Sequence, residues 1–271
     1  MSKILFTDLD GTLLNDKKTI SDSLKKALIN LLKSGNKLVL SSGRPYDSIA
    51  AVKEHLGLPD ENVYISAYNG SYVVDCTTKE VLVEKRVAIE DILHISEVAG
   101  QMGLHCHTYT DTHIVSRSET PELQFYRQTI RLPLILSSDW ENTLTKAPFK
   151  ALAVHLHDHT KLVALIERLK NWADGKIMMV FSNPCYLEFL PADSGKGEAL
   201  KAVCEHLSIP INHCMAAGDA ENDLTMIEAA GTGIAMANAE PELKEAADFV
   251  TYHSNNEDGL LPFIISFFEL S

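Results

Sequence analysis

A short apolar run near the N-terminus, Ile4-Leu5-Phe6, leads almost directly into Asp8-Leu9-Asp10-Gly11-Thr12. The apolar run predicts a buried strand, and the Gly-Thr pair predicts a turn that follows it. The two carboxylates then stand at the carboxyl end of a strand, where open α/β sheets bind their ligands. Neighbouring carboxylates repel each other unless a cation or a shared proton relieves them. The motif therefore points to a metal ion, although on its own it is equally compatible with a plain polar turn.

Strand and helix patterns alternate on either side of a different middle third. We expect helices over 21–34, 45–55, 196–207, 221–230 and 260–268, and strands over 37–40, 63–66, 214–217 and 233–236. Such alternation is typical of a parallel sheet with crossover helices. The middle third lacks apolar strands that end in an acid, and its helices are expected near 89–102 and 160–173, with strands near 105–116, 149–157 and 177–190. The sequence therefore predicts an α/β protein: a Rossmann-like core with helices on both faces from residues 1–83 and 190–271, and a smaller α/β domain inserted at 84–189.

Composition excludes several classes of partner. The formal net charge of −13 argues against nucleic acid and anionic membranes, because both require a basic face. The five cysteines are scattered and lack CxxC spacing, which favours free thiols in a reducing cytoplasm. No secretory leader pattern precedes the first strand, and the longest apolar run, 260–268, is too short to span a bilayer. We therefore expect a cytoplasmic protein that concentrates its few positive charges wherever it binds an anion.

A second acidic motif, Gly218-Asp219-Ala220-Glu221-Asn222-Asp223, also lies where an apolar strand gives way to a helix. Asp219 and Asp223 are four residues apart, so a helical start would point both the same way. Acids are also common in first helical turns because they complement the helix dipole, and that explanation suits Glu221. Together with Asp8 and Asp10, however, these carboxylates offer hard oxygen ligands of the kind that suit Mg²⁺.

Two further segments could hold a phosphate group. Ser42-Gly43 ends a strand, and a hydroxyl with a backbone N–H at a helix start can bind phosphate oxygens, although a plain N-cap serine fits as well. Lys196 lies between two glycines at a predicted helix start, where the backbone could approach a ligand and the ammonium could neutralise its charge. Gly-Lys-Gly alone is a weak signal.

Other polar residues leave their role open. Arg44 could contact the inserted domain or the substrate, or pair with an acid. Histidines alternate at 105 and 107 and at 155, 157 and 159, so each set could share a strand face, as in metal sites. Because no carboxylate or cysteine completes such a site, we interpret these histidines as exposed or as facing a substrate.

Taken together, the motifs resemble the haloacid dehalogenase superfamily, and most closely its Cof-type, sugar-phosphatase-like branch. That branch typically carries Asp-x-Asp-Gly-Thr-Leu-Leu, Thr/Ser-Gly-Arg-Pro, Asn-Gly, Lys-Gly and Gly-Asp-x-x-Asn-Asp in this order. Here they stand as 8–14, 42–45, 69–70, 196–197 and 218–223. The resemblance covers the whole chain and implies that 84–189 is a cap domain. Serine replaces the commoner threonine at position 42, which removes no chemical group.

The resemblance implies a Mg²⁺-dependent phosphatase that acts on small phosphorylated metabolites, sugar phosphates first, through an aspartyl-phosphate. Asp8 would be the nucleophile and Asp10 the general acid and base. Mg²⁺ would be held by the Asp8 side chain, the Asp10 backbone carbonyl and Asp219; phosphate would be bound by Ser42, Gly43, Lys196 and Asn222; and Asp223, Thr12, Arg44 and Asn69 would support them. A phosphomutase with the same intermediate, or a binding protein that retained the fold, are the alternatives.

Overall fold

The computed structural model describes residues 2–270, which form two compact units. The core unit comprises the residues up to Glu84 and from Gly195 onward, and the inserted unit is Lys85–Ser194. The core strands are β1 (Ile4–Asp8), β2 (Lys37–Ser41), β3 (Val63–Ala67), β4 (Tyr72–Asp75), β5 (Val81–Glu84), β12 (Cys214–Gly218), β13 (Thr232–Ala235) and β14 (Phe249–Val250). The core helices are α1 (Asp22–Lys33), α2 (Tyr46–His55), α7 (Lys196–His206), α8 (Leu224–Ala229), α9 (Pro241–Ala246) and α10 (Leu261–Phe268), with 3-10 turns η1 (Tyr68–Gly70), η2 (Ile211–His213), η3 (Glu221–Asp223) and η4 (Asn255–Glu257).

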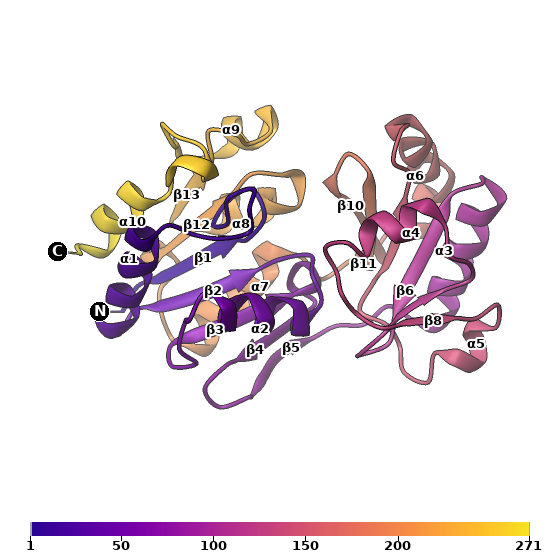
Figure 1. Cartoon of the computed structure of the whole chain (residues 1–271), viewed down its shortest axis with the longest axis horizontal. Helices are drawn as coiled ribbons and strands as arrows, with labels where there is room; N and C mark the ends of the chain where they lie inside the picture. The colour runs from indigo at the N-terminus through magenta and orange to yellow at the C-terminus, as the bar shows by residue number, and fades with distance from the viewer. Residues whose placement is uncertain (1, 271) are drawn as a thin grey trace. The chain divides into compact units, whose positions relative to one another are not determined.

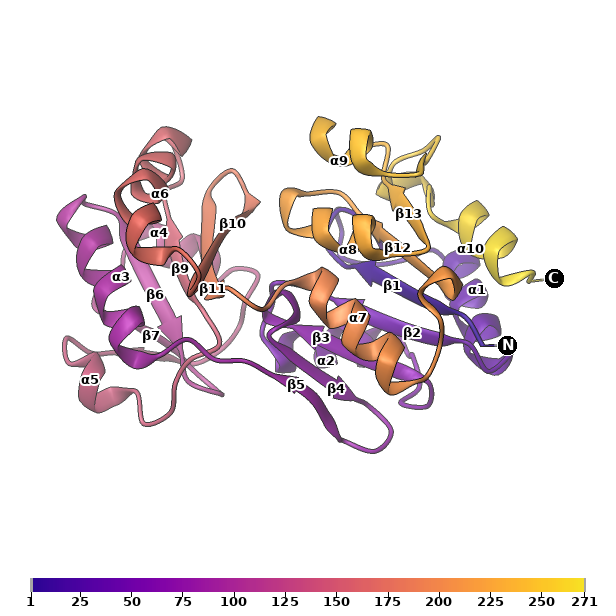
Figure 2. The same ribbon diagram turned by 180° about the vertical axis from the view of Figure 1, so that it is seen from behind.

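The core sheet places the first strand at its centre. The strand order is β14-β13-β12-β1-β2-β3-β4-β5, and β1 pairs in parallel with both β2 and β12. Helices α1 and α2 cover one face, whereas α7 and α8 cover the other (Figures 1 and 2). The carboxyl ends of β1, β2 and β12 therefore meet at one edge of the sheet, as the alternating pattern predicts.

Helix α1 shows how local sequence determines one of these elements. Ser21 is its N-cap, and the hydroxyl accepts a hydrogen bond from the Leu24 N–H at 3.0 Å. The predicted apolar stripe, which includes Leu28 and Leu31, is buried. Capping and a one-sided apolar face are sufficient to specify a helix of this length on a sheet.

The core sheet is parallel over most of its width, as expected, and antiparallel at one end. Strands β4 and β5 extend the sheet in antiparallel pairing beyond β3. The link from β3 to β4 is only the turn around Tyr68–Gly70, and a parallel pair needs a crossover of a dozen residues or more. The short turn therefore forces a hairpin here.

The inserted unit has its own sheet and its own apolar core. Its strands are β6 (His105–Tyr109), β7 (Ile114–Ser116), β8 (Leu134–Leu136), β9 (Ala151–Val154), β10 (Ile177–Asn183) and β11 (Tyr186–Pro191), and its helices are α3 (Ile89–Gln101), α4 (Pro121–Tyr126), α5 (Trp140–Thr143) and α6 (His159–Ala173). The strand order is β10-β11-β9-β6-β7-β8. Apolar side chains of this sheet, among them Ala151, Ala153 and Phe189, pack with those of α3 and α6. Across residues 2–270 no helix combines the length and apolar character needed to cross a membrane.

Candidate active site

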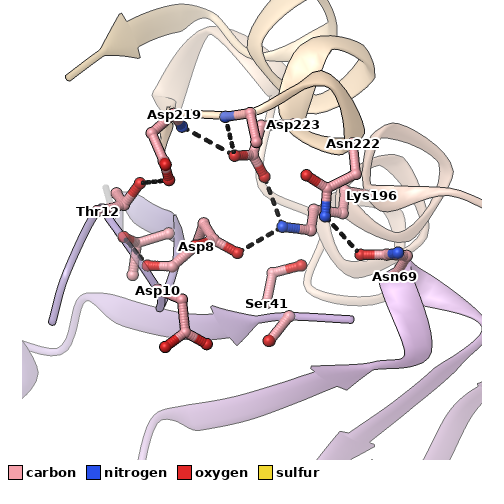
Figure 3. A network of polar contacts seen from close by, with 12 residues as sticks. Asp8, Asp10, Thr12, Ser41, Asn69, Lys196, Asp219, Asn222 and Asp223 are labelled. Carbon is pink, nitrogen blue, oxygen red and sulfur yellow. Dashed lines mark hydrogen bonds and ion pairs between the residues drawn. The ribbon is translucent and has the colours of Figure 1, made fainter. Parts of the chain in front are cut away.

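Asp8 ends the central strand β1 and lies against a fully buried lysine. Lys196 Nζ is 2.6 Å from Asp8 Oδ1 and 2.5 Å from Asp223 Oδ1 (Figure 3). Lys196 has no exposed surface, and Asp8 retains 6%. Since Lys196 is the first residue of α7 and Asp223 ends η3, the fold brings three distant motifs together at this edge of the sheet.

The carboxylates outnumber the cation in this cluster. Ligand atoms of Asp8, Asp219 and Asp223 lie within 4.8 Å of one another, the one such group of three or more possible metal ligands that residues 2–270 contain. Burial raises the pKa of Asp8 well above its usual range; Lys196 opposes this, and the neighbouring aspartates add to it. Burial and the charge of Asp223 raise the pKa of Asp219 to about 7. The site therefore favours an added positive charge, and its hard oxygen donors fit Mg²⁺.

Lys196 is held in its charged form by the same cluster. Burial alone would lower the pKa of its ammonium, but the charges of Asp223 and Asp8 raise it above the ordinary value. A lysine that stays charged without solvent contact can neutralise negative charge at a fixed point.

The loop that carries Asp219 and Asp223 differs from the expected helical start. Asp219 precedes η3, and the Asp223 carboxylate turns back to accept the backbone N–H groups of Asp219 at 2.8 Å and Ala220 at 3.1 Å. A Cβ on Gly218 would lie 2.4 Å from Asp223 Cβ, so only glycine permits this close return. The two acids converge through this turn rather than through helical spacing.

The turn after β1 is fastened to the second acidic motif. Thr12 Oγ1 donates a hydrogen bond of 2.7 Å to Asp219 Oδ1. Gly11 has φ +83°, and a Cβ there would lie 2.3 Å from Asp219 Oδ2. Asn238 Nδ2 donates to the Gly11 carbonyl at 2.7 Å. Sequence reasoning missed Asn238; its position shortly after the end of β13 is the signal that could have found it.

Asp10 pairs with other cations than Asp8 does. The Arg44 guanidinium binds its carboxylate through two hydrogen bonds of 2.7 and 2.6 Å, and Lys18 Nζ lies 2.6 Å away. Burial raises the pKa of Asp10, but the charges and hydrogen bonds of Arg44 and Lys18 outweigh it, so the pKa falls below its usual value. Of the roles left open for Arg44, the structure shows pairing with an acid. No motif in the sequence indicates Lys18.

Ser42 is not a helix cap. Helix α2 begins at Tyr46, and Pro45 is its N-cap. The Ser42 hydroxyl accepts the Arg44 N–H at 3.2 Å, and the Ser42 N–H donates to the Ser66 carbonyl at 2.9 Å. Of the Ser42-Gly43 pair, the Ser42 amide is therefore already used within the fold.

The two glycines beside Lys196 meet different local requirements of the fold. Gly195 has φ +125°, and a Cβ on Gly197 would lie 2.4 Å from the Thr225 carbonyl oxygen. Gly197 N–H also donates to Thr225 Oγ1 at 3.1 Å. Gly197 therefore lets α7 pack closely on α8.

The histidines of β6 are buried, which contradicts the interpretation that they are exposed. His105 and His107 do share a strand face, and their rings are joined by a hydrogen bond of 3.0 Å. Burial holds the pKa of both imidazoles below the ordinary value. The second set does not share a strand face, because β9 ends at Val154 and His159 already belongs to α6.

Comparisons with known proteins agree with this architecture. The family model of the haloacid dehalogenase-like hydrolases matches residues 5–264. A crystal structure of a haloacid dehalogenase-like hydrolase from Bacteroides thetaiotaomicron superposes with a TM-score of 0.87 at 32% identity, covering 98% of this chain and 99% of the other. The chain is also 30% identical to the 5-amino-6-(5-phospho-D-ribitylamino)uracil phosphatase YwtE of Bacillus subtilis (97% of this chain, 96% of the relative). It is 29% identical to an HMP-PP phosphatase of Yersinia pseudotuberculosis (90% and 87%).

The core is a parallel-rich α/β sheet with a carboxylate–lysine cluster at the carboxyl edge of its strands. The match over nearly its whole length places the chain in one family: it belongs to the haloacid dehalogenase-like hydrolases.

Proposed function

We propose that this chain is a Mg²⁺-dependent phosphatase of small phosphorylated metabolites that acts through a phosphoryl group on Asp8. The observation that carries the proposal is the placement of Asp8, buried at the sheet edge between Lys196 and two further acids. Two relatives are named as phosphatases of small molecules, which supports the substrate class. Sugar phosphates remain the first substrates to test.

Asp8 and Asp219 would hold Mg²⁺ with their side chains, together with the Asp10 backbone carbonyl, while Asp223 supports them from beside Lys196. Bound Mg²⁺ would offset the charge of the carboxylates and of the phosphate group. The raised pKa values of Asp8 and Asp219 support this assignment, because they arise from burial and from repulsion between the acids, and a bound cation offsets both.

The reaction divides between the two N-terminal aspartates. An oxygen of Asp8 forms a bond to phosphorus while the ester oxygen leaves, and the leaving oxygen takes a proton from Asp10. Water then attacks phosphorus, Asp10 takes up its proton, and the bond from Asp8 to phosphorus breaks to release inorganic phosphate. Arg44 and Lys18 favour the ionised form of Asp10, which is the form that the second step needs, whereas the first step uses the protonated carboxyl. Lys196, Ser42 and Asn222 would bind the phosphate oxygens and stabilise their charge.

The central test is phosphate release by Asp8→Asn. We expect kcat to fall by about 10⁴-fold or more, because the amide cannot act as the nucleophile. The assay covers sugar phosphates, pyridoxal phosphate, flavin mononucleotide and nucleotides, ranked by kcat/KM. Asp22→Asn, an exposed acid in the first turn of α1, is the matched control and should be fully active.

EDTA should stop the wild-type reaction, and Mg²⁺ should restore it. Undiminished hydrolysis by purified Asp8→Asn would contradict the nucleophile, and full activity after exhaustive chelation would contradict the metal. Return of the phosphoryl group to the substrate without free phosphate would indicate a phosphomutase instead.

A further inference from the structure

The turn Tyr68–Gly70, directly after β3, has an unusual backbone. Tyr68, Asn69 and Gly70 all have positive φ, at 50°, 52° and 90°. Two consecutive residues with side chains in the left-handed region are uncommon, and asparagine tolerates that region better than most residues. Such a conformation persists only where the surroundings hold it in place, and it concentrates at functional sites.

The surroundings of this turn are three motifs of the site. The Tyr68 N–H donates to the Arg44 carbonyl at 3.1 Å, and the Asn69 N–H donates to the Ser42 carbonyl at 3.0 Å. A Cβ on Gly70 would lie 2.4 Å from the Gly195 carbonyl oxygen, so the turn lies directly against the residue before Lys196. The turn thus joins the loop after β2 to the start of α7.

The Asn69 side chain makes the third connection. Its Oδ1 accepts a hydrogen bond from Asn222 Nδ2 at 2.9 Å (Figure 3), and Asn69 is only 1% exposed. An asparagine side chain carries N–H donors on one end and a carbonyl acceptor on the other. Because Asn69 presents an acceptor, it selects the rotation of Asn222 in which the NH₂ group faces this side of the site.

We infer that Asn69 is a positioning residue that sets the orientation of the Asn222 amide toward the phosphate group. This inference rests on the proposed phosphatase function, in which Asn222 contacts the transferring oxygens. One N–H of Asn222 is bound by Asn69, so the second N–H is the amide donor that remains for an anionic ligand. A reversed amide would turn a carbonyl oxygen toward the phosphate and repel it.

The test is a double-mutant cycle in kcat with Asn69→Gly and Asn222→Ala. Glycine keeps the left-handed backbone and removes the side chain that carries the acceptor. We expect Asn222→Ala to lower kcat about 100-fold, and Asn69→Gly to lower it about 10-fold to 100-fold with little change in KM. In the Asn222→Ala background, Asn69→Gly should cost no further activity, since Asn69 acts through Asn222.

Asn62→Gly is the matched control. Asn62 also has a positive φ, 65°, but it precedes the opposite end of β3, where its amide bonds to Lys37 and to the Leu32 carbonyl. The Asn62→Gly variant should lower Tm without changing kcat. It therefore separates the effect of a general loss of rigidity in β3 from the effect of a loss of positioning. If Asn69→Gly does not fold, the same cycle is measured with Asn69→Ser, because the serine side chain is too short to reach Asn222.

Multiplicative losses in the double variant would overturn the inference, because Asn69 would then act independently of Asn222. So would full activity of a folded Asn69→Gly. Absence of phosphate release by the wild-type enzyme with Mg²⁺ would instead contradict the proposed function itself, so the two failures are distinguishable.

Discussion

Each of the two units contains a buried polar cluster, and the clusters differ in how their charges balance. In the core unit, Lys196 pairs with Asp8 and Asp223, and Asp219 lies close to both acids. In the inserted unit, Lys150 pairs with Glu188 at 2.7 Å, and both are almost fully buried. Beside this pair run neutral groups joined in a chain: His105 to His107 and His107 to Tyr109 at 3.0 Å each, and Tyr109 to Tyr126 at 2.6 Å.

From this difference we expect the cluster in the core unit to be the one that binds a ligand. A buried ion pair with matched charges leaves no net charge for a further ion to offset. Where buried carboxylates are in excess, burial and mutual repulsion raise their pKa values. Binding of a cation would then lower the free energy of the site. Both clusters consist of buried polar groups. The excess of negative charge therefore distinguishes the candidate active site from the cluster around Lys150 and Glu188.

The largest expected effect compares the two buried lysines. Lys196→Met and Lys150→Met should each lower the free energy of unfolding of their own unit by about 3–5 kcal/mol in EDTA, because each leaves buried carboxylates unpaired. Mg²⁺ should restore part of the loss for Lys196→Met, since the cation takes over some of its charge compensation, and none for Lys150→Met. Hydrogen exchange of amides in β1 and in β9 measures the two units separately.

The double variant Lys150→Met/Glu188→Leu serves as the control in the inserted unit. Replacing both partners of a buried pair by apolar groups is often neutral, so it should recover most of the stability lost in Lys150→Met. Equal rescue of both single lysine variants by Mg²⁺ would break the distinction between the clusters.

The next effect is a pair of opposite pH dependences without metal. Burial lowers the pKa of His105 from 6.5 to about 4, so the unfolded chain binds the extra proton between these values. The free energy of unfolding of the inserted unit should therefore be unaffected by His105 above pH 6.5. It should fall by about 2–3 kcal/mol as the pH decreases from 6.5 toward 4. Asp219 has the reverse sign: its pKa is raised from 3.8 to about 7, so the core unit loses stability as the pH rises from 4 to 7.

Substitution of each group should flatten the slope of its own unit alone. His105→Gln keeps a donor for His107 but no longer titrates, and Asp219→Asn removes the carboxyl. Hydrogen exchange at constant temperature across pH 4–7, corrected for the intrinsic rate, reports both slopes. Slopes of the same sign in both units would contradict the assignment of opposite electrostatic character.

Sequence reasoning located one cluster and missed the other for physical reasons. Asp8 and Asp219 each follow an apolar strand, and parallel strands bring their carboxyl ends together, so local pattern and topology suffice. The alternation of His105 and His107 predicted a shared face, but whether that face is covered depends on α4, a helix of six residues that no periodicity reveals.

The finer geometry of the active site was also beyond local pattern. The contact of Asn238 with Gly11 joins residues 227 apart, and nothing in either segment indicates the other. Lys18 lies in a polar turn whose composition fits solvent as well as it fits Asp10. Strands β4 and β5 were missed because their antiparallel pairing is determined by the preceding turn and not by an apolar strand followed by an acid.

The smallest expected effect is the response of the two units to Mg²⁺ alone. A ligand that binds only the folded state stabilises it by RT ln(1 + [L]/Kd), which is about 1.4 kcal/mol at ten times Kd. Amides of β1 and β12 that exchange through opening of the core unit should therefore exchange about tenfold more slowly, while those of β6 and β9 in the inserted unit stay unchanged. Asp219→Asn should remove most of this protection, because it deletes one of the clustered oxygen donors, and Asp22→Asn should not. Protection that is equal in both units, or that survives in Asp219→Asn, would mean that the carboxylate excess at the end of β1 is not what binds the cation.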